Sequence, residues 1–351
     1  MKRGRDYRLT RDKASYQGAL GHYLSPRRRD PVKTLMEEVV SHKIFASAVR
    51  RLRLPVGRPL RVLDIGSGVG DGFALLTEPH GDLAPVTADR RLDYVGLDGD
   101  PDMIETATAL HPVSEATFRL GDMRDRLPEG DFDLYLSCGV PYSHLTTSEM
   151  TEVIANIMRR ILAAGRRAAI VVDVLGRFSI EWMRNWHSPR WNYAMTFFED
   201  TTERLEQQMT FFDRTSLGEA IAAASRSTGA QPAELGFTDR SILVGRHTAT
   251  RAFNPAIPPY RTLVNDLARD PSSVSLPELY FEPPTAGAPP EILHFFRALA
   301  GSWTELLDQA ATGSGKRVRA LASALLRCET REQRGLGVGH SLTATVIIDA
   351  S

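Results

Sequence analysis

Short apolar runs alternate with amphipathic stretches between residues 61 and 175 of the chain. In the amphipathic stretches, apolar residues recur every three or four positions, which is typical of helices that bury one face. The clearest such helix covers Met150 to Leu162, follows the capping-box pair Thr146 and Glu149, and stops at Gly165. The apolar runs are predicted strands and read RVLDIG, YVGLDG, TFRLGDM, FDLYLSCGV and AAIVVDVL. Because these strands are apolar throughout and alternate with helices, they predict a parallel sheet covered on both faces.

Beyond this region the alternation is interrupted and then resumes. Residues 176–214 contain RWNYAMTFFED and RLEQQMTFFDR, which predict an antiparallel hairpin inserted into the core. A helix over about 215–229 follows, and AELGFTDRSILVGRH is predicted to supply the final antiparallel strands. Together these elements predict an α/β fold, built on a doubly wound, mostly parallel sheet of seven strands.

Two further regions flank this core, which we place at residues 56–248. Residues 1–55 begin as a basic, loop-rich segment, continue into a helix that starts at Asp30, and are expected to cap the core as a helical lid. A proline-rich stretch marks the start of a small α+β segment, 249–351, which ends in a last strand, SLTATVII. This C-terminal segment is expected either to complete a binding pocket or to pair two subunits.

Composition and charge narrow the classes of function. Among 351 residues, 43 basic side chains balance 43 acidic ones. The zero net charge argues against a general nucleic-acid binder, although the arginines at 27–29 can form a local basic patch. The two cysteines, Cys138 and Cys328, belong to no metal-binding motif and indicate a reduced, cytoplasmic setting. No stretch approaches the roughly 18 apolar residues of a membrane span, and the basic start lacks the apolar run of a secretory signal.

A glycine-rich turn follows the first predicted strand, in the segment VLDIGSGVGDG at 62–72. Glycine lets a ligand approach the backbone closely, because a Cβ atom would block that approach. The spacing from Gly66 to Gly70 is G-x-G-x-G, whereas dinucleotide-binding turns carry G-x-G-x-x-G. An acidic residue, Asp64, lies inside the preceding strand. The turn by itself is compatible with a nucleotide-type ligand and with a plain tight turn.

The segment DIGSGVG resembles the first motif of the class I S-adenosylmethionine-dependent methyltransferases, and later segments fit the same family in order. Residues 98–103, DGDPDM, are similar to the family's acidic-x-x-Pro-x-Met pattern after the second strand, and residues 121–123, GDM, follow the third strand. The resemblance covers about residues 56–248. It implies a Rossmann-like methyltransferase of the small-molecule type, which uses S-adenosylmethionine and releases S-adenosylhomocysteine.

The same resemblance assigns roles to individual residues. It implies that Asp98 holds the ribose hydroxyls in charge-assisted hydrogen bonds, that Asp122 takes the adenine amino group, and that Asp64 orders the amino-acid end of the cofactor. Acidic side chains suit the ammonium group and sulfonium centre of this cofactor, whereas a pyrophosphate favours helix N-terminal amides. The full expected cofactor set is Asp64, Gly66, Ser67, Gly68, Gly70, Asp98, Gly99, Met103, Gly121, Asp122, Met123, Ser137 and Cys138.

The methyl acceptor is expected beside residues 137–144, SCGVPYSH, because ligands of parallel sheets bind beyond the carboxyl ends of the strands. His144 is the first candidate for a general base, since histidine titrates near neutral pH. It can equally cap the next helix or lie in solvent. Tyr142 is a candidate orienting group, and His187 in the predicted insert is a third candidate catalytic residue.

Aromatic residues are concentrated in the insert around His187. They form either the wall of an acceptor pocket or merely the core of the insert or a dimer contact. By analogy with lidded relatives, Tyr16 and Tyr23 are expected to belong to the N-terminal lid. The aromatic residues of the insert are Phe178, Trp182, Trp186, Trp191, Tyr193, Phe197 and Phe198.

The predicted function is metal-independent methyl transfer to an oxygen or nitrogen of a small, natural-product-type acceptor. Metal-dependent catechol-type relatives carry an aspartate after the fourth strand and Asp-Asn after the fifth. This chain has Ser-Cys-Gly at 137–139 and Asp173-Val174 at those places. Two alternatives stay open, namely an RNA or peptide methyltransferase and a scaffold that binds the cofactor without catalysis. No membrane or nucleic-acid partner is expected, and a homodimer stays open.

Overall fold

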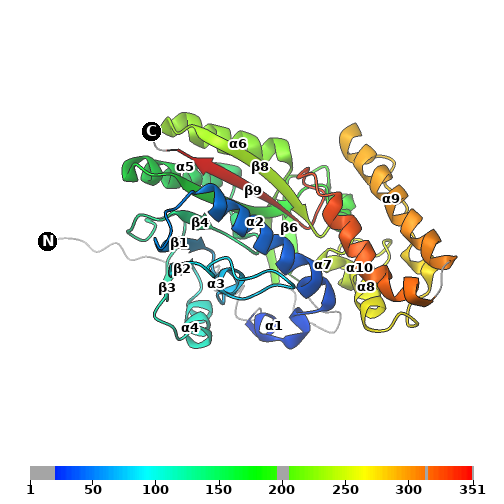
Figure 1. Ribbon diagram of the computed structural model, residues 1–351. Helices are drawn as coiled ribbons and strands as arrows, with labels where there is room; N and C mark the ends of the chain where they lie inside the picture. The colour runs from blue at the N-terminus through cyan, green and yellow to red at the C-terminus, as the bar shows by residue number, and fades with distance from the viewer. Residues whose placement is uncertain (1–19, 196–204, 313–314, 350–351) are drawn as a thin grey trace.

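The structure is a computed structural model that describes residues 20–195, 205–312 and 315–349. Three residues singled out from the sequence, Tyr16, Phe197 and Phe198, lie outside these ranges. Within them, nine strands form one sheet, and five of these strands run parallel in the order β3-β2-β1-β4-β5 (Figure 1). Their bounds are β1 Leu60–Ile65, β2 Leu92–Asp98, β3 Ala116–Leu120, β4 Leu134–Leu136 and β5 Ala168–Gly176. The predicted α/β class and parallel core are therefore confirmed.

Helices cover both faces of this sheet, which explains why its central strands are apolar on both sides. Along β5, Ile170 packs on one face with helices α5 and α6, whereas Val171 packs on the other face with α2. The capping box of Thr146 and Glu149 begins α5, as its sequence predicts. The flanking helices are α2 Glu38–Arg51, α3 Asp71–Thr77, α4 Pro101–Leu110, α5 Thr147–Ala164 and α6 Arg214–Thr228.

The sheet is completed by a strand from the far end of the chain. Strand β9, Ser341–Ile348, lies antiparallel between β5 and β8, Pro232–Arg240 (Figure 1). The sequence-based core boundary at residue 248 therefore leaves out an interior strand. The physical reason is burial: seven of the eight positions of β9 are buried, whereas eight of the nine positions of the edge strand β8 are half-buried or exposed. Residues 242–244, expected in a final strand, are buried instead among the C-terminal helices.

The inserted hairpin is confirmed. Strands β6, Arg190–Met195, and β7, Leu205–Phe212, pair antiparallel, and β7 joins the end of β5 over two residue pairs. Most of the aromatic residues preceding it form core: Phe178, Trp182 and Trp186 are buried in one large apolar cluster. For these rings the structure favours the core of the insert over the wall of a pocket.

The second layer of the molecule is helical and comes from the chain between β8 and β9. It gathers at one end of the sheet, next to the hairpin (Figure 1). Within the described ranges, no helix has both the length and the apolar character that crossing a membrane requires. The helices of this layer are α7 Arg246–Thr250, α8 Tyr260–Arg269, η6 Leu276–Leu279, α9 Pro290–Ala311 and α10 Gly315–Arg331.

The N-terminal region reaches across to this layer. The helix predicted after Asp30 is observed as a π-helical turn, η3, which continues into α2. The guanidinium of Arg261, on α8, donates to Asp30 at 2.8 Å and to Glu37 at 2.7 Å. This buried network fixes the N-terminal segment against the C-terminal helices. The short elements of this region are α1 Leu20–Leu24, η2 Pro26–Arg28 and η3 Lys33–Glu37.

Candidate cofactor and acceptor site

A cavity of about 1180 Å³ lies where the parallel strands end. Four segments that follow strands line one part of it, namely 66–71, 97–103, 121–125 and 138–141. Eleven of the thirteen expected cofactor residues line this cavity, because the carboxyl ends of neighbouring parallel strands meet at one edge of the sheet. They are Gly66, Ser67, Gly68, Gly70, Asp98, Gly99, Met103, Gly121, Asp122, Met123 and Cys138.

The glycine turn needs its glycines for two different reasons. Gly66 has φ 71°, and a Cβ atom there would lie 2.3 Å from Cβ of Pro141, so the close packing of two loops excludes a side chain. Gly68 has φ 52°, and no atom would lie within 4 Å of its Cβ. The backbone at Gly68 therefore faces open space in the cavity, which is the approach that a ligand requires.

Asp98 ends β2 and is tied to that turn. Its Oδ2 accepts a hydrogen bond from the backbone N–H of Gly68 at 2.8 Å, and its Oδ1 accepts one from Asp100 at 2.9 Å. Burial raises the pKa of Asp98, and these backbone donors offset part of the rise. Each carboxylate oxygen retains a further lone pair, so the group can also accept the two hydroxyls of a ribose.

Asp122 and Ser67 provide further polar groups at the part of the cavity that the strand-end loops line. Asp122 lies after β3 and accepts hydrogen bonds from the backbone and side chain of Arg124, both at 2.9–3.0 Å. Partial burial raises the pKa of Asp122, but the Arg124 guanidinium outweighs it and the net shift is downward. The hydroxyl of Ser67 is buried at the cavity wall without a hydrogen-bond partner among the described residues. An open glycine backbone, two carboxylates and an unpartnered hydroxyl fit the amino-acid, ribose and adenine groups expected there.

Two residues of the expected cofactor set lie beneath the cavity. Asp64 is fully buried, and its Oδ2 accepts the hydroxyl of Tyr94 at 2.5 Å, while its Oδ1 has no partner in the described part of the chain. Burial raises the pKa of Asp64 to about 7, although the Tyr94 hydrogen bond opposes the rise. The hydroxyl of Ser137 donates to the carbonyl of Val171 at 2.9 Å and so links β4 to β5. Neither side chain lines the cavity.

The three expected catalytic residues separate in the structure. His144 lines the cavity, but Tyr142 is 1% exposed and packs in the core beneath α5, and His187 is exposed on the surface and is not among the lining residues. His144 and Tyr142 separate because a 3₁₀ turn, η4, covers Pro141–His144. Positions i and i+3 of such a turn share a face, so Pro141 and His144 face the cavity together while Tyr142 faces the core.

Comparison with known families decides what this arrangement is. Residues 62–165, which contain the glycine turn, Asp98 and Asp122, match the family model described as "Methyltransferase domain". Residues 62–165 therefore form a methyltransferase domain. The protein is a methyltransferase, and its cofactor is S-adenosylmethionine.

This methyltransferase is similar to several solved structures, including the following three. A TehB-like S-adenosylmethionine-dependent methyltransferase from Corynebacterium glutamicum is 22% identical over 55% of this chain and 76% of that chain, with a TM-score of 0.33. The sugar N-methyltransferase KedS8 from Streptoalloteichus is 16% identical over 66% and 91%, with a TM-score of 0.41. DesVI from Streptomyces venezuelae is 16% identical over 58% and 87%, with a TM-score of 0.38.

The other end of the methyltransferase cavity is built from residues that the sequence does not single out, apart from Tyr193. They come from the N-terminal segment, the hairpin and both ends of the helical layer, and no local motif connects them. Their convergence depends on the crossing of β9 and on the buried Arg261 network. These residues are Lys33, Glu37, Tyr193, Gln207, Met209, Arg240, Arg246 and His340.

His340 is held in this wall of the methyltransferase by a buried carboxylate. Its Nδ1 lies 2.8 Å from Oε1 of Glu181, a residue that is 1% exposed. The second oxygen of Glu181 accepts the backbone N–H of His247 at 2.5 Å. Burial raises the pKa of Glu181, but His340 and His247 outweigh it and the net shift is downward. A carboxylate at Nδ1 favours the tautomer whose Nε2 is free to accept a proton.

Proposed function

We propose that this methyltransferase transfers the methyl group of S-adenosylmethionine to an oxygen or nitrogen atom of a small organic acceptor. One observation carries the proposal: a single cavity joins the cofactor loops to the wall that contains His144, Tyr193 and His340. Pockets for one drug-sized ligand measure about 300–1,000 Å³. A cavity of about 1180 Å³ therefore accommodates a cofactor together with a small acceptor.

The residues of the cavity would act mainly by aligning the methyl group with the acceptor atom. When bound, the cofactor supplies an electrophilic methyl group, and displacement at that carbon needs the acceptor atom held in line with it. A base is needed only where the acceptor atom still carries a proton. His340 is the better-positioned candidate, because Glu181 fixes its ring and leaves Nε2 as the proton acceptor. His144, the last residue of η4, is the second candidate base.

A reaction without a metal ion is supported by the engagement of Asp173. Its Oδ2 accepts from the backbone of Gly139 and from Arg240, both at 3.0 Å, and its Oδ1 accepts the hydroxyl of Thr343 at 2.9 Å. The carboxylate at this position, where catechol-type relatives carry Asp-Asn, thus already accepts hydrogen bonds from protein donors on both oxygens. We propose that it supports the fold around β9 and the cavity wall.

Calorimetric titration of S-adenosylmethionine and S-adenosylhomocysteine tests the cofactor part of this proposal. The Asp98→Ala variant is expected to lose about tenfold or more in affinity, because two charge-assisted hydrogen bonds are removed. Asp93→Ala is the matched control, since Asp93 lies on the same strand, is partly exposed and is remote from the cavity lining. Equal affinity of the wild type for NAD, or full affinity in Asp98→Ala, would contradict the assignment.

A further inference from the structure

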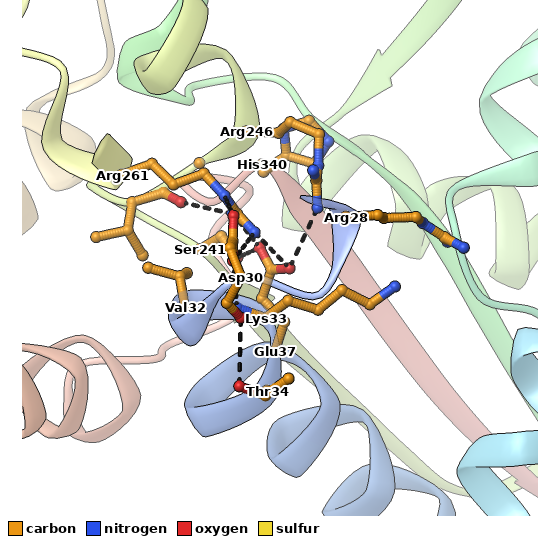
Figure 2. A network of polar contacts seen from close by, with 12 residues as sticks. Arg28, Asp30, Val32, Lys33, Thr34, Glu37, Ser241, Arg246, Arg261 and His340 are labelled. Atoms are coloured by element: carbon orange, nitrogen blue, oxygen red, sulfur yellow. Dashed lines mark hydrogen bonds and ion pairs between the residues drawn. The ribbon is translucent and has the colours of Figure 1, made fainter. Parts of the chain in front are cut away.

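Among the cationic side chains that line the cavity, Arg28, Lys33 and Arg246 lie close enough to repel one another. Arg28 and Lys33 come from the N-terminal segment, and Arg246 begins α7 in the C-terminal layer; all three line the cavity. Arg28 and Lys33 both pair with Asp71, the first residue of α3, the latter at 3.7 Å. In Figure 2 both side chains extend away from the Arg261 network, whereas a dashed line joins Arg246 to Glu37.

Arg246 differs from the other two in having almost no partner of its own. Its nearest carboxylate is Glu37, at 3.9 Å, which exceeds hydrogen-bond distance. Glu37 already accepts both guanidinium nitrogens of Arg261, at 2.7 and 3.2 Å, and the hydroxyl of Ser241 at 2.7 Å (Figure 2). No hydrogen bond from Arg246 is found in the part of the chain that the structure describes, although only 14% of its side chain is exposed.

The electrostatics agree with this geometry. Burial lowers the pKa of Arg246 to about 10, and repulsion from Arg261 adds to that effect more than Glu37 offsets it. Burial likewise lowers the pKa of Lys33 to about 8; Asp71 opposes this, while Arg28 and Arg246 strengthen it. The fold thus keeps a buried guanidinium, with five N–H donors, next to other cations. Such an arrangement is costly unless an anion occupies it.

We propose that Arg246 binds an anionic group, a carboxylate or a phosphate ester, on the methyl acceptor. The inference rests on the proposed function and specifies its substrate class. A planar guanidinium can take two oxygens of either anion at once. Tyr193 and Met209 line the same cavity and offer it apolar surface. The acceptor then has an apolar body, an anionic group at Arg246 and its reacting atom toward His340.

The competing occupant is the carboxylate of the cofactor itself. Arg28 and Lys33 are better placed for that role, because Asp71 holds them next to the glycine turn at the start of α3. Arg246 lies instead in the layer that supplies His340 and the partners of Tyr193, whose hydroxyl contacts His247. The two assignments make different predictions for ligands that lack one carboxylate.

Titrations into the protein saturated with S-adenosylhomocysteine test the proposal. The probes are benzoate, phenyl phosphate and the neutral benzamide. The wild type is expected to bind the anions about tenfold or more tightly than benzamide, with weakening as salt rises. Arg246→Gln should lose this preference and Arg246→Lys should keep part of it. Arg226→Gln, which removes an exposed charge on α6, should behave as the wild type.

Three results would overturn the inference and are distinguishable from one another. If the loaded wild type binds benzoate, phenyl phosphate and benzamide alike, the acceptor is not anionic and the proposed function stands. If Arg246→Gln weakens S-adenosylhomocysteine but not 5′-methylthioadenosine, which lacks the carboxylate, then Arg246 serves the cofactor. If S-adenosylhomocysteine does not bind the wild type at all, the proposed function fails and the inference fails with it. Thermal unfolding of each variant checks folding, and removal of a repelled charge should not lower the melting temperature.

Discussion

Nδ1 of His340 lies 2.8 Å from the carboxylate of Glu181, although 159 positions separate the two residues. His340 lines the acceptor end of the cavity, and the pair joins a loop before β9 to the turn η5, Ile180–Asn185. A histidine oriented by a buried carboxylate is a recurrent arrangement for general-base catalysis. Its role here can be separated from that of the other candidate histidines by substitution.

The first prediction concerns this pair. His340→Asn is expected to lower kcat by about 10²–10⁴ on an acceptor that must lose a proton, because the base is removed. Glu181→Gln is expected to cause a smaller loss, since it removes only the orientation of the ring. Release of S-adenosylhomocysteine measures turnover, and its binding affinity should not change in either variant. His187→Asn is the control, since His187 is exposed and outside the cavity lining. Full activity of His340→Asn would remove this residue from the mechanism.

The second prediction separates the two glycines of the cofactor turn. Gly66→Ala places a Cβ atom 2.3 Å from Pro141, so both stability and cofactor affinity should fall. Gly68→Ala meets no protein atom within 4 Å, so stability should fall only by the left-handed backbone cost of about 1–2 kcal/mol. Its Cβ would nevertheless occupy the ligand side of the turn and reduce affinity for S-adenosylhomocysteine.

Urea unfolding and calorimetry on both variants measure this split between stability and binding. If Gly68→Ala bound the cofactor as tightly as the wild type, the backbone at residue 68 would not face the ligand.

The third prediction is a dependence of stability on pH through Asp64. Burial raises the pKa of Asp64 to about 7, whereas the unfolded chain titrates near 3.8. Between these values the unfolded state loses a proton that the folded state keeps. The free energy of unfolding of the ligand-free protein should therefore fall as pH rises from about 4 to about 7. This carboxyl group accounts for about 2–4 kcal/mol of that fall. Asp64→Asn should flatten that part of the curve.

Urea unfolding at pH 5 and pH 8 provides the measurement, with Asp93→Asn as the control on the neighbouring strand. Some decline should persist in Asp64→Asn, because burial also raises the pKa of Glu329 to about 7 despite three backbone donors. Identical pH profiles for the wild type and Asp64→Asn would show that the carboxyl is charged in the folded state.

The fourth prediction tests whether the fold requires strand β9. The fragment 1–248 lacks β9 and therefore exposes edges of β5 and β8 that are paired in the full chain. It should not unfold cooperatively and should be cut rapidly by protease, since the removed strand is almost entirely buried. A variant lacking only residues 350–351 is the control and should behave as the full chain. A stable, cofactor-binding fragment 1–248 would contradict the importance of β9.

The cofactor end of the site could be predicted from the sequence because its signals are local. The glycine turn, Asp98 and Asp122 each follow a strand within a few residues, and parallel strands bring such positions to one edge without further information. The same reasoning failed for Tyr142, because a 3₁₀ turn directs it into the core while it presents His144 to the cavity. It also failed for His187, since nothing in the pattern of the insert showed which of its faces is exposed.

The sequence by itself determined the class of fold, the parallel core and the position of the cofactor turn, because hydrophobic period, capping residues and glycine spacing act over short distances. Only the tertiary structure decided that a strand near residue 345 completes the sheet. It also decided that Arg246 and His340 face the same cavity as Asp98. Those relationships depend on burial of β9 between two strands and on Arg261 joining segments more than 220 positions apart. Such contacts are set by the packing of the whole chain, which no local pattern records.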